Sequence, residues 1–316
     1  MRDGLPAGDD AASARARCRA VVVCHRPDPA VLDDVLAAVT PQVAGVLVVA
    51  NDGATPAGAM PATVEVLVPD RNLGLGAAYN AAARWADARG ATHLLLLDQD
   101  SVPGPDMVAR LHAAITAPSG GTGRVAAAGP LWRDRAGGRD GHFVRLGRRR
   151  LTRLRPAAGA VVETDFLLSS GSLIDLAAVA AVGPFDAALF IEHVDTDWSL
   201  RARAAGWRLL GVADARLDHA LGQGRFPGLP GRLAPTLAHY PPERSYWLVR
   251  NSVALWRRPY APPEWRRADL RRTAGLVAAH LIFAPQRLCR LRHVLRGLRD
   301  GRRLAAGAID NPGAPP

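Results

Sequence analysis

Two carboxylates follow an apolar run in the segment HLLLLDQDS, which covers residues 93–101. Four consecutive leucines are typical of a strand that is buried on both faces. Side chains two residues apart on an extended chain point the same way, so Asp98 and Asp100 would face one spot. Two like charges there favour a divalent cation between them, although an Asp pair that only caps a turn is the common alternative. The segment therefore raises the hypothesis of a metal site at a strand end.

Two further loops contain residues suited to bind a nucleotide. In DRNLGLGAAYN, Gly74 and Gly76 stand where an extended segment turns into a helix, and glycine there lets backbone N–H groups approach an anion. In VVANDGA, Asn51 and Asp52 follow a strand, and a carboxylate in that place accepts from a ribose hydroxyl or a base N–H. Each feature alone also occurs as plain turn chemistry. Together with the acidic strand end, the two loops favour nucleotide binding.

The segment EHVDTDWSLR supplies a third acidic cluster. Glu192, Asp195 and Asp197 lie near the start of a predicted helix, where the helix dipole favours negative charge. A carboxylate on a rigid helix is suited to act as a general base, and we favour Asp195, with Glu192 and Asp197 as its rivals. His219 follows the next predicted strand, and an imidazole beside two carboxylates would complete a divalent-cation site.

Alternating strands and helices must position these loops. Between residues 19 and 120, short apolar runs alternate with helical stretches, which is typical of a mostly parallel sheet with helices on both faces. Ligands bind to such sheets beyond the C-terminal strand ends, where the loops CHRPD, ANDGA, PDRNLG and DQDS would meet. The predicted strands are 19–24, 43–52, 64–70, 92–100 and 124–129, and the predicted helices are 28–42, 74–90 and 191–207.

Composition sets the class of protein. The chain has 316 residues, of which 48% are hydrophobic and 22% are charged, the balance of a globular protein. No run of about 20 apolar residues occurs, and the N-terminal segment lacks the apolar region of a signal peptide, so we expect a cytoplasmic protein. Cys18, Cys24 and Cys289 have no C-x-x-C spacing, so the sequence predicts neither a disulfide framework nor a zinc site.

Six segments in order resemble those of a known family. They are NLGLGAAYN, LLLLDQDS, SSGSLI, FIEHVDTDWSLRARAAGW, LDHALGQ and HYPPERSYWLVRN. With them, residues 19–256 resemble the family 2 inverting glycosyltransferases of GT-A fold, and are most similar to the rhamnosyltransferases that build bacterial surface polysaccharides. The resemblance implies an α/β domain, Rossmann-like with a mostly parallel central sheet, and an enzyme that depends on Mg²⁺ or Mn²⁺ bound at a D-x-D motif.

The resemblance also implies a role for each matching residue. Asp195 would be the general base, and Asp100 and His219 would be metal ligands. The positions that would bind the donor nucleotide are Asp52, Asn72, Gly74, Asp98 and Arg250. Those on the acceptor side would be Ser170, Gly171 and Arg201.

The implied reaction is transfer of L-rhamnose from dTDP-L-rhamnose to a glycan or polyprenyl-linked acceptor in cell-surface polysaccharide synthesis. Transfer of galactofuranose or a hexose from a UDP-sugar is the alternative. A nucleotidyltransferase on a similar fold would use the same loops but would not need the Asp195 helix. Nucleic-acid binding would require aromatic residues among the C-terminal arginines, where only Phe283 occurs between residues 266 and 303, so we expect no nucleic-acid partner. A homo-oligomer is left open.

The C-terminal segment concentrates the positive charge. Residues 257–303 contain thirteen arginines against three carboxylates, a local balance of +10 in a chain of net charge +11. Leucines recur there at three- and four-residue steps. One interpretation is a helix packed on the catalytic domain with a solvated basic face. The other is a pair of interfacial helices on an anionic membrane surface, which would place a cytoplasmic protein peripherally at the inner face of the cell membrane.

The predicted organisation has four parts. They are a disordered lead-in over residues 1–18, a GT-A domain over 19–256, a basic amphipathic helical extension over 257–303 and a disordered tail over 304–316.

Overall fold

The computed structural model describes most of the chain. The described residues are 8–56, 60–117, 123–134, 140–147, 151–219, 225–226, 237–238 and 240–306. The chain divides into two compact units. Unit 1 comprises Met1–Arg145, Thr152–Ala187 and Val194–Ala220, and unit 2 comprises Leu146–Leu151, Ala188–His193 and Leu221–Pro316.

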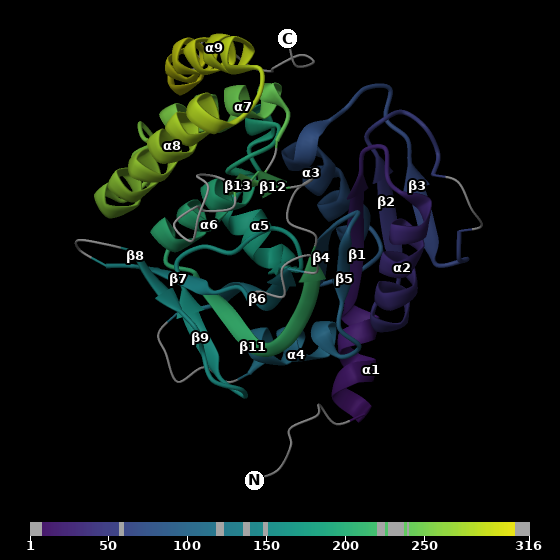
Figure 1. Ribbon diagram of the computed structural model, residues 1–316. Coiled ribbons are helices and arrows are strands. Elements are labelled where there is room, and N and C mark those ends of the chain that lie inside the picture. Colours follow the sequence, from purple (N-terminus) through teal and green to yellow (C-terminus); the bar gives the residue numbers. More distant parts are fainter. Residues whose placement is uncertain are drawn as a thin grey trace. The chain divides into compact units, whose positions relative to one another are not determined.

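Unit 1 is built around a nine-stranded sheet (Figure 1). Its strands are β1 (Cys18–Cys24), β2 (Val46–Ala50), β3 (Val64–Leu67), β4 (His93–Asp98), β5 (Ser101–Pro103), β6 (Val125–Asp134), β9 (Val161–Thr164), β10 (Leu173–Asp175) and β11 (Arg208–His219). Their order is β3-β2-β1-β4-β10-β6-β11-β5, and β9 also pairs with β11. The central strands β1, β2 and β4 are buried almost throughout, as continuous runs of valine and leucine predict.

The predicted α/β class is confirmed, and the sheet is mixed rather than mostly parallel. Strands β1 to β4 pair in parallel, as the alternating pattern predicted, and so do β6 and β11. Strand β10 runs antiparallel between β4 and β6, and β11 runs antiparallel to β5 and β9. Before β10 the chain makes a turn in which the Ser172 N–H donates to the Ser169 carbonyl at 2.9 Å, and the Gly171 N–H donates to the Leu96 carbonyl of β4 at 2.7 Å.

Helices cover both faces of the sheet. They are α1 (Gly8–Arg17), α2 (Pro29–Val39), α3 (Gly74–Asp87), α4 (Met107–Thr116), α5 (Leu176–Val182) and α6 (Val194–Ala204), with short 3₁₀ turns at Thr40–Gln42 and Ala187–Leu189. Apolar side chains of α2 and α4 pack into one core with alternate residues of β1 and β4. Residues 8–17, predicted as part of a disordered lead-in, instead form α1, which packs against α4 and buries Ala14.

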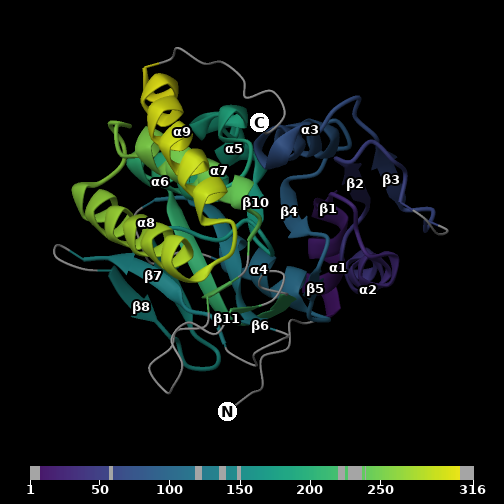
Figure 2. The same ribbon diagram turned by 45° about the horizontal axis from the view of Figure 1, so that its top comes forward.

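The described part of unit 2 consists mainly of three helices. They are α7 (Pro242–Leu255), α8 (Pro263–Phe283) and α9 (Arg287–Ala305). Figure 2 shows α9 lying along α7. The contact is close because glycines face α7: a Cβ at Gly297 would come within 2.8 Å of the Tyr246 carbonyl oxygen, and one at Gly301 within 2.5 Å of that of Arg250. The predicted boundary at residue 256 therefore lies too late, since α7 belongs with the C-terminal helices.

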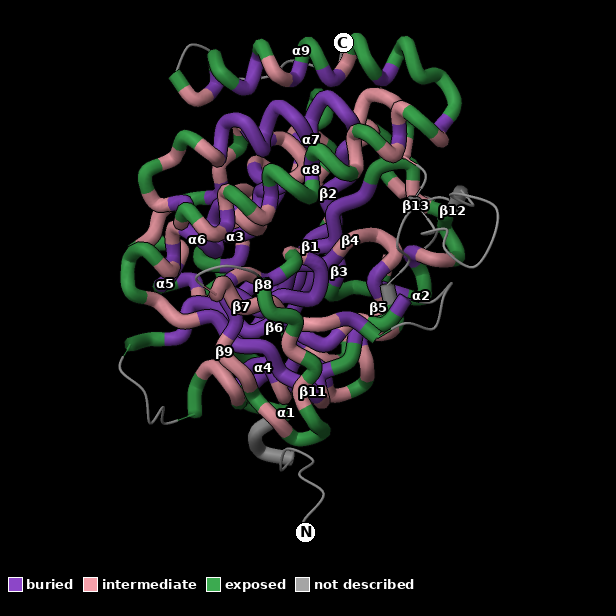
Figure 3. Tube along the Cα trace, turned by 60° about the vertical axis from the view of Figure 1, so that its left-hand side comes forward, coloured by how far each residue is buried: buried purple, intermediate pink, exposed green. Residues whose placement is uncertain are grey.

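Helix α9 has a buried and an exposed side. Arg290, Val294, Gly297, Gly301 and Leu304 are buried, whereas the α9 outer face carries Leu288, Leu291 and Leu295, which are 76%, 40% and 58% exposed. Figure 3 shows the two sides as alternating buried and exposed turns above α7. Among the described residues, no helix is long and apolar enough to cross a membrane.

Two sheets of two strands each complete the described elements. One pairs β7 (Phe143–Leu146) with β8 (Leu151–Leu154), and the other pairs β12 (Arg225–Phe226) with β13 (Leu237–Ala238).

Candidate active site

Three loops at the C-terminal ends of β1, β2 and β4 are hydrogen-bonded to one another and to the loop before α3. The His25 N–H donates to the Gln99 side chain at 2.7 Å, and the Arg26 N–H donates to Asp52 Oδ2 at 3.0 Å. Asn72 Nδ2 lies 3.5 Å from His25 Nδ1. The predicted meeting of these loops at one sheet edge is thus confirmed.

Asparagines shape the start of α3. The side-chain oxygen of Asn51 accepts from the Leu73 N–H at 3.1 Å, and that of Asn72 accepts from the Gly74 N–H at 2.9 Å. Gly74 has φ of +71°, a conformation that favours glycine. Asn72 and Gly74 therefore set the path of the backbone into the helix, and their contact with a nucleotide stays a prediction.

One of the two carboxylate oxygens of Asp52 makes no hydrogen bond to the described residues. Its Oδ2 accepts from the backbone at Arg26, while its Oδ1 is buried and has no hydrogen-bond partner among the described residues. A buried acceptor without a donor is unfavourable, so a ligand hydroxyl or N–H at this atom would be stabilising. This geometry is compatible with the nucleoside contact that the sequence suggested.

The acidic strand end is tied to the loop that precedes β10. Asp98 is the last residue of β4, and its N–H donates to Ser170 Oγ at 3.4 Å. The Ser170 hydroxyl in turn donates to Ser101 Oγ at 2.5 Å. Gln99 and Asp100 form the turn between β4 and β5. Both carboxylates of the D-x-D segment are half-buried, so they remain partly open to solvent.

Strand pairing brings the backbone of Asp100 close to that of His219, the two residues expected to bind a metal. Asp100 directly precedes Ser101, and Ser101 pairs with His219 in the antiparallel register of β5 and β11. The side chain of His219 lies outside the described part of the structure. Two carboxylates and an imidazole are a donor set that suits Mg²⁺ or Mn²⁺. The backbone positions of Asp100 and His219 are compatible with a divalent-cation site, and the metal site stays a prediction.

Asp195 and Asp197 have very different surroundings on α6. Asp195 is half-buried, its Oδ2 accepts from the Ser169 N–H at 3.1 Å, and its Oδ1 accepts from the Thr196 N–H at 2.6 Å. Asp197 is fully buried and pairs with Arg201 Nε at 2.9 Å. A general base must reach its substrate, and only Asp195 of these two is partly accessible.

The other rival, Glu192, does not lie on the helix. The predicted helix over 191–207 includes Glu192, but α6 begins at Val194, and Glu192 precedes it with φ of +58°. Its carboxylate pairs with Arg244 Nε at 2.5 Å. Burial alone would raise the pKa of Glu192, but the nearby Arg244 outweighs burial and holds the pKa below its ordinary value.

Three residues predicted on the acceptor side have evident structural tasks. Ser170 makes the hydrogen bonds described above. Gly171 has φ of +84°, and a Cβ there would approach Pro130 Cγ to 2.5 Å. Arg201 donates to Asp197 and also to the carbonyls of Val182 and Pro184, at 3.2 and 2.8 Å. Contact of these residues with an acceptor stays a prediction.

Arg250 and Asn251 hold a loop within unit 2. Arg250 is 1% exposed, stacks over the Trp247 ring at 4.5 Å and donates to the Ala188 carbonyl. Asn251 Nδ2 donates to the Leu189 and Glu192 carbonyls, both at 2.8 Å. The segment they hold leads directly into α6. The structure thus gives Arg250 a positioning role, and its predicted donor contact is untested.

Tyr79 is a buried residue of unit 1 that the sequence analysis did not single out. It belongs to α3, is fully buried and packs edge-on against Phe185 at 5.3 Å. Its pKa lies well above the ordinary value because it is buried, and because Asp98 and Asp195 lie near it; the nearby Ser169 side chain acts in the opposite direction. The sequence feature that could have pointed to Tyr79 is its single hydroxyl on the alanine-rich face of a predicted helix.

An apolar cavity opens beside Ser170. Its volume is about 170 Å³, and its lining includes Trp132, Phe143, Phe166 and Leu168. These side chains come from unit 1.

A mixed α/β sheet with nucleotide-suited loops, an acidic turn after β4 and a carboxylate at the start of α6 resembles the arrangement of GT-A glycosyltransferases. Comparison with known proteins agrees. Residues 21–153 match the family model described as glycosyl transferase family 2. Residues 21–153 are thus similar to the family 2 glycosyl transferases.

Known proteins are similar to this chain in sequence or in fold. A dTDP-rhamnosyl transferase, RfbF, from Shigella flexneri is 26% identical over 204 residues, which are 63% of this chain and 65% of the relative. A crystal structure of GalNAc-T7 with UDP, GalNAc and Mn²⁺ matches with a TM-score of 0.56 and 15% identity, over 94% of this chain and 59% of that one. The chain thus spans less than two thirds of the length of either protein, and the structural likeness concerns the fold alone.

Proposed function

We propose that the protein is an inverting glycosyltransferase that transfers L-rhamnose from dTDP-L-rhamnose to a glycan or polyprenyl-linked acceptor in bacterial cell-surface polysaccharide synthesis. The observation that carries the proposal is the carboxylate of Asp195, which is partly accessible and held by two backbone N–H groups in the same unit as the acidic turn after β4. The donor sugar is suggested by the Shigella flexneri relative, which is a dTDP-rhamnosyl transferase.

Inversion at a sugar carbon requires a base on the side opposite the leaving group. Asp195 takes the proton of the acceptor hydroxyl as the hydroxyl oxygen attacks the anomeric carbon. The N–H groups of Ser169 and Thr196 hold the carboxylate in one orientation, so little reorganisation is needed. The bond between the anomeric carbon and the diphosphate oxygen breaks, and the electron pair leaves with the nucleoside diphosphate.

The donor is bound at the edge of the sheet. The free Oδ1 of Asp52 accepts a hydrogen bond from the nucleoside. Asp98, Asp100 and His219 would hold a Mg²⁺ or Mn²⁺ ion, which would supply positive charge against the diphosphate leaving group.

The alternative donor is a UDP-linked hexose or galactofuranose, which would use the same carboxylates. The cavity beside Ser170 favours rhamnose, because aromatic and aliphatic side chains line it and a 6-deoxy sugar presents a methyl group where a hexose presents a hydroxymethyl group.

Donor binding to the purified protein tests the proposal without knowledge of the acceptor. Calorimetric titrations of dTDP-L-rhamnose, UDP-galactose, UDP-galactofuranose and UDP-glucose should be run with Mn²⁺, with Mg²⁺ and with EDTA. We expect dTDP-L-rhamnose to bind most tightly, and only with a metal present. If the protein bound a UDP-sugar more tightly than dTDP-L-rhamnose, the proposed donor would be wrong. Equal donor binding in EDTA would contradict the metal site.

We also propose that unit 2 contacts an anionic membrane surface, where a lipid-linked acceptor resides. The α9 outer face exposes three leucines, and Arg287, Arg292, Arg299 and Arg302 are also exposed on this helix. Apolar side chains among arginines suit an interface with anionic headgroups, to which each arginine contributes about 1 kcal/mol. This proposal combines the two interpretations of the sequence, since one side of α9 packs on α7 and the other is open.

A further inference from the structure

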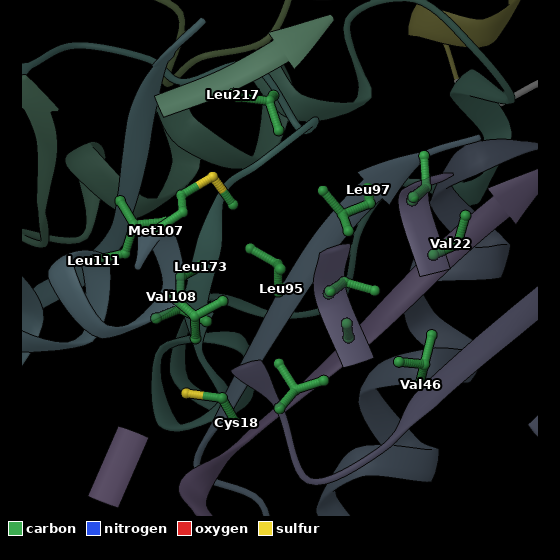
Figure 4. Packing of buried hydrophobic residues seen from close by; sticks show 14 of the residues in the cluster. Cys18, Val22, Val46, Leu95, Leu97, Met107, Val108, Leu111, Leu173 and Leu217 are labelled. Carbon is green, nitrogen blue, oxygen red and sulfur yellow. The ribbon is translucent and has the colours of Figure 1, made fainter. Parts of the chain in front are cut away.

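A cysteine and two histidines meet at the edge of the sheet opposite the candidate active site. Cys18 and His93 are the first residues of β1 and β4, and they are direct partners in the parallel register. His112 lies on α4, which packs on this face of the sheet. Figure 4 shows Cys18 of β1 in the core cluster beside Val108, which belongs to α4.

The three side chains are arranged as metal ligands. One ligand atom from each of Cys18, His93 and His112 lies within 4.8 Å of the other two. All three residues are buried, at 0%, 6% and 7% exposure. In a tetrahedral zinc site such atoms are about 3.5 Å apart, so modest side-chain rotations would bring them onto one ion.

His93 has a nitrogen atom with no internal partner. Its Nδ1 lies 2.8 Å from Thr92 Oγ1, while its Nε2 is buried and has no hydrogen-bond partner among the described residues. A metal-bound histidine commonly donates its other ring N–H to an oxygen atom, and Thr92 Oγ1 supplies that acceptor. Burial first, and then the neighbouring His112, lower the pKa of His93 to about 4, so the imidazole is neutral at pH 7.

Charges of both signs surround the cluster, since Arg17 lies close enough to contribute to the lowered pKa of His93. Cys18 directly follows the C-terminal residue of α1, where the helix dipole is negative. Asp175 pairs with His93 across β10 and β4, so a carboxylate lies near the cluster. Burial raises the pKa of the Cys18 thiol to about 12, so the metal must displace a proton on binding.

We infer that Cys18, His93 and His112 form a buried zinc site, distinct from the carboxylate site at the other end of β4. A thiolate with two imidazoles is a zinc donor set, and the fourth position is open to water. The ion would join the starts of β1 and β4 to α4, so its effect would be on stability.

Cobalt substitution tests this site with a readout that the carboxylate site cannot produce. A thiolate bound to Co²⁺ gives a charge-transfer band in the near ultraviolet, whereas oxygen ligands do not. The full-length protein should be expressed in zinc-supplemented medium, analysed for bound zinc, and then unfolded and refolded with Co²⁺. We expect one thiolate-bound Co²⁺ per chain, and a higher melting temperature with zinc than after chelation.

Variants assign the band to its ligands. Cys18→Ala and His112→Phe should lose it, whereas Cys24→Ala, which removes a buried thiol at the other end of the same strand, should keep it. Circular dichroism shows which variants are folded. Absence of the band from the wild type would overturn the inference without any variant. So would a band that survives in folded Cys18→Ala, or one that Cys24→Ala abolishes.

Discussion

Asp195 and Asp197 are two residues apart on α6 but are suited to different tasks. Asp195 is half-buried and held by backbone donors, so we expect Asp195→Asn to keep its shape but lose the ability to accept a proton. Turnover should fall about 10²- to 10⁴-fold, the usual contribution of a general base. Donor affinity should remain within about twofold. Initial rates of nucleoside diphosphate release and calorimetric donor binding measure the two effects.

Asp197→Asn is the matched control. It leaves Arg201 beside a neutral amide in a buried place, so we expect a loss of stability of about 3 kcal/mol. The turnover of the folded fraction should stay close to that of the wild type. If Asp197→Asn were inactive at unchanged stability and Asp195→Asn were active, the base would have been assigned to the wrong carboxylate.

Metal dependence can be tested at Asp100, a predicted metal ligand. Asp100→Ala should abolish metal-dependent donor binding and transfer while the melting temperature changes little, because the stability of β4 lies in its buried leucines. Asp87→Ala, at an exposed carboxylate near the end of α3, serves as control and should behave as the wild type. Undiminished turnover of the wild type in EDTA would contradict the assignment.

At the scale of elements, close helix packing makes the clearest prediction. Gly301→Ala places a methyl group against the Arg250 carbonyl of α7, and overpacking of this kind costs about 1–3 kcal/mol. Gly275→Ala on α8 has open space around the new Cβ, so helix propensity should raise stability by up to about 1 kcal/mol. Urea unfolding measures both. Equal effects of the two changes would show that α9 is not seated on α7 as described.

Element boundaries depended on contacts that the local sequence does not show. The acidic residues of EHVDTDW suggested a helix that includes Glu192, but Asn251 draws the carbonyl of Glu192 outward and the helix begins after it. The sequence likewise suggested that Gly76 helps to bind an anion. In the structure, a Cβ there would come within 2.7 Å of the Asp186 carbonyl oxygen, so close backbone packing accounts for it.

At the scale of the whole molecule, the concentration of charge in the C-terminal helices predicts membrane association. Leu288→Ser with Leu295→Ser should reduce co-sedimentation with anionic vesicles at low salt, because both leucines are more than half exposed on α9. Val68→Ser with Val161→Ser removes exposed apolar side chains of unit 1 and should have no effect. Binding by the wild type should weaken with salt. A wild type that ignores anionic vesicles at low salt would contradict the proposal.

Much of unit 1 was accessible from sequence because its signals are local. Runs such as LLLLD and VLVVA predict buried strands, and the helical stretches between them predict parallel neighbours. Strand ends carrying Asp52, Asp98 and Asp100 then had to share an edge, since parallel strands end on the same side. The hydrogen bonds between these loops confirm that expectation. The sequence also placed Asp195 at the start of a helix, where α6 has it.

Tertiary structure decided what depends on residues far apart in the chain. Asp195 and Asp197 look alike in sequence, and only the approach of Ser169 to one and of Arg201 to the other separates them. The three cysteines predicted no zinc site, because Cys18 meets His93 and His112 only when β1 pairs with β4 and α4 packs over both. Spacing along a chain predicts contacts within a helix or strand, but contacts between elements follow from how the core packs, and packing is settled by all of the elements at once.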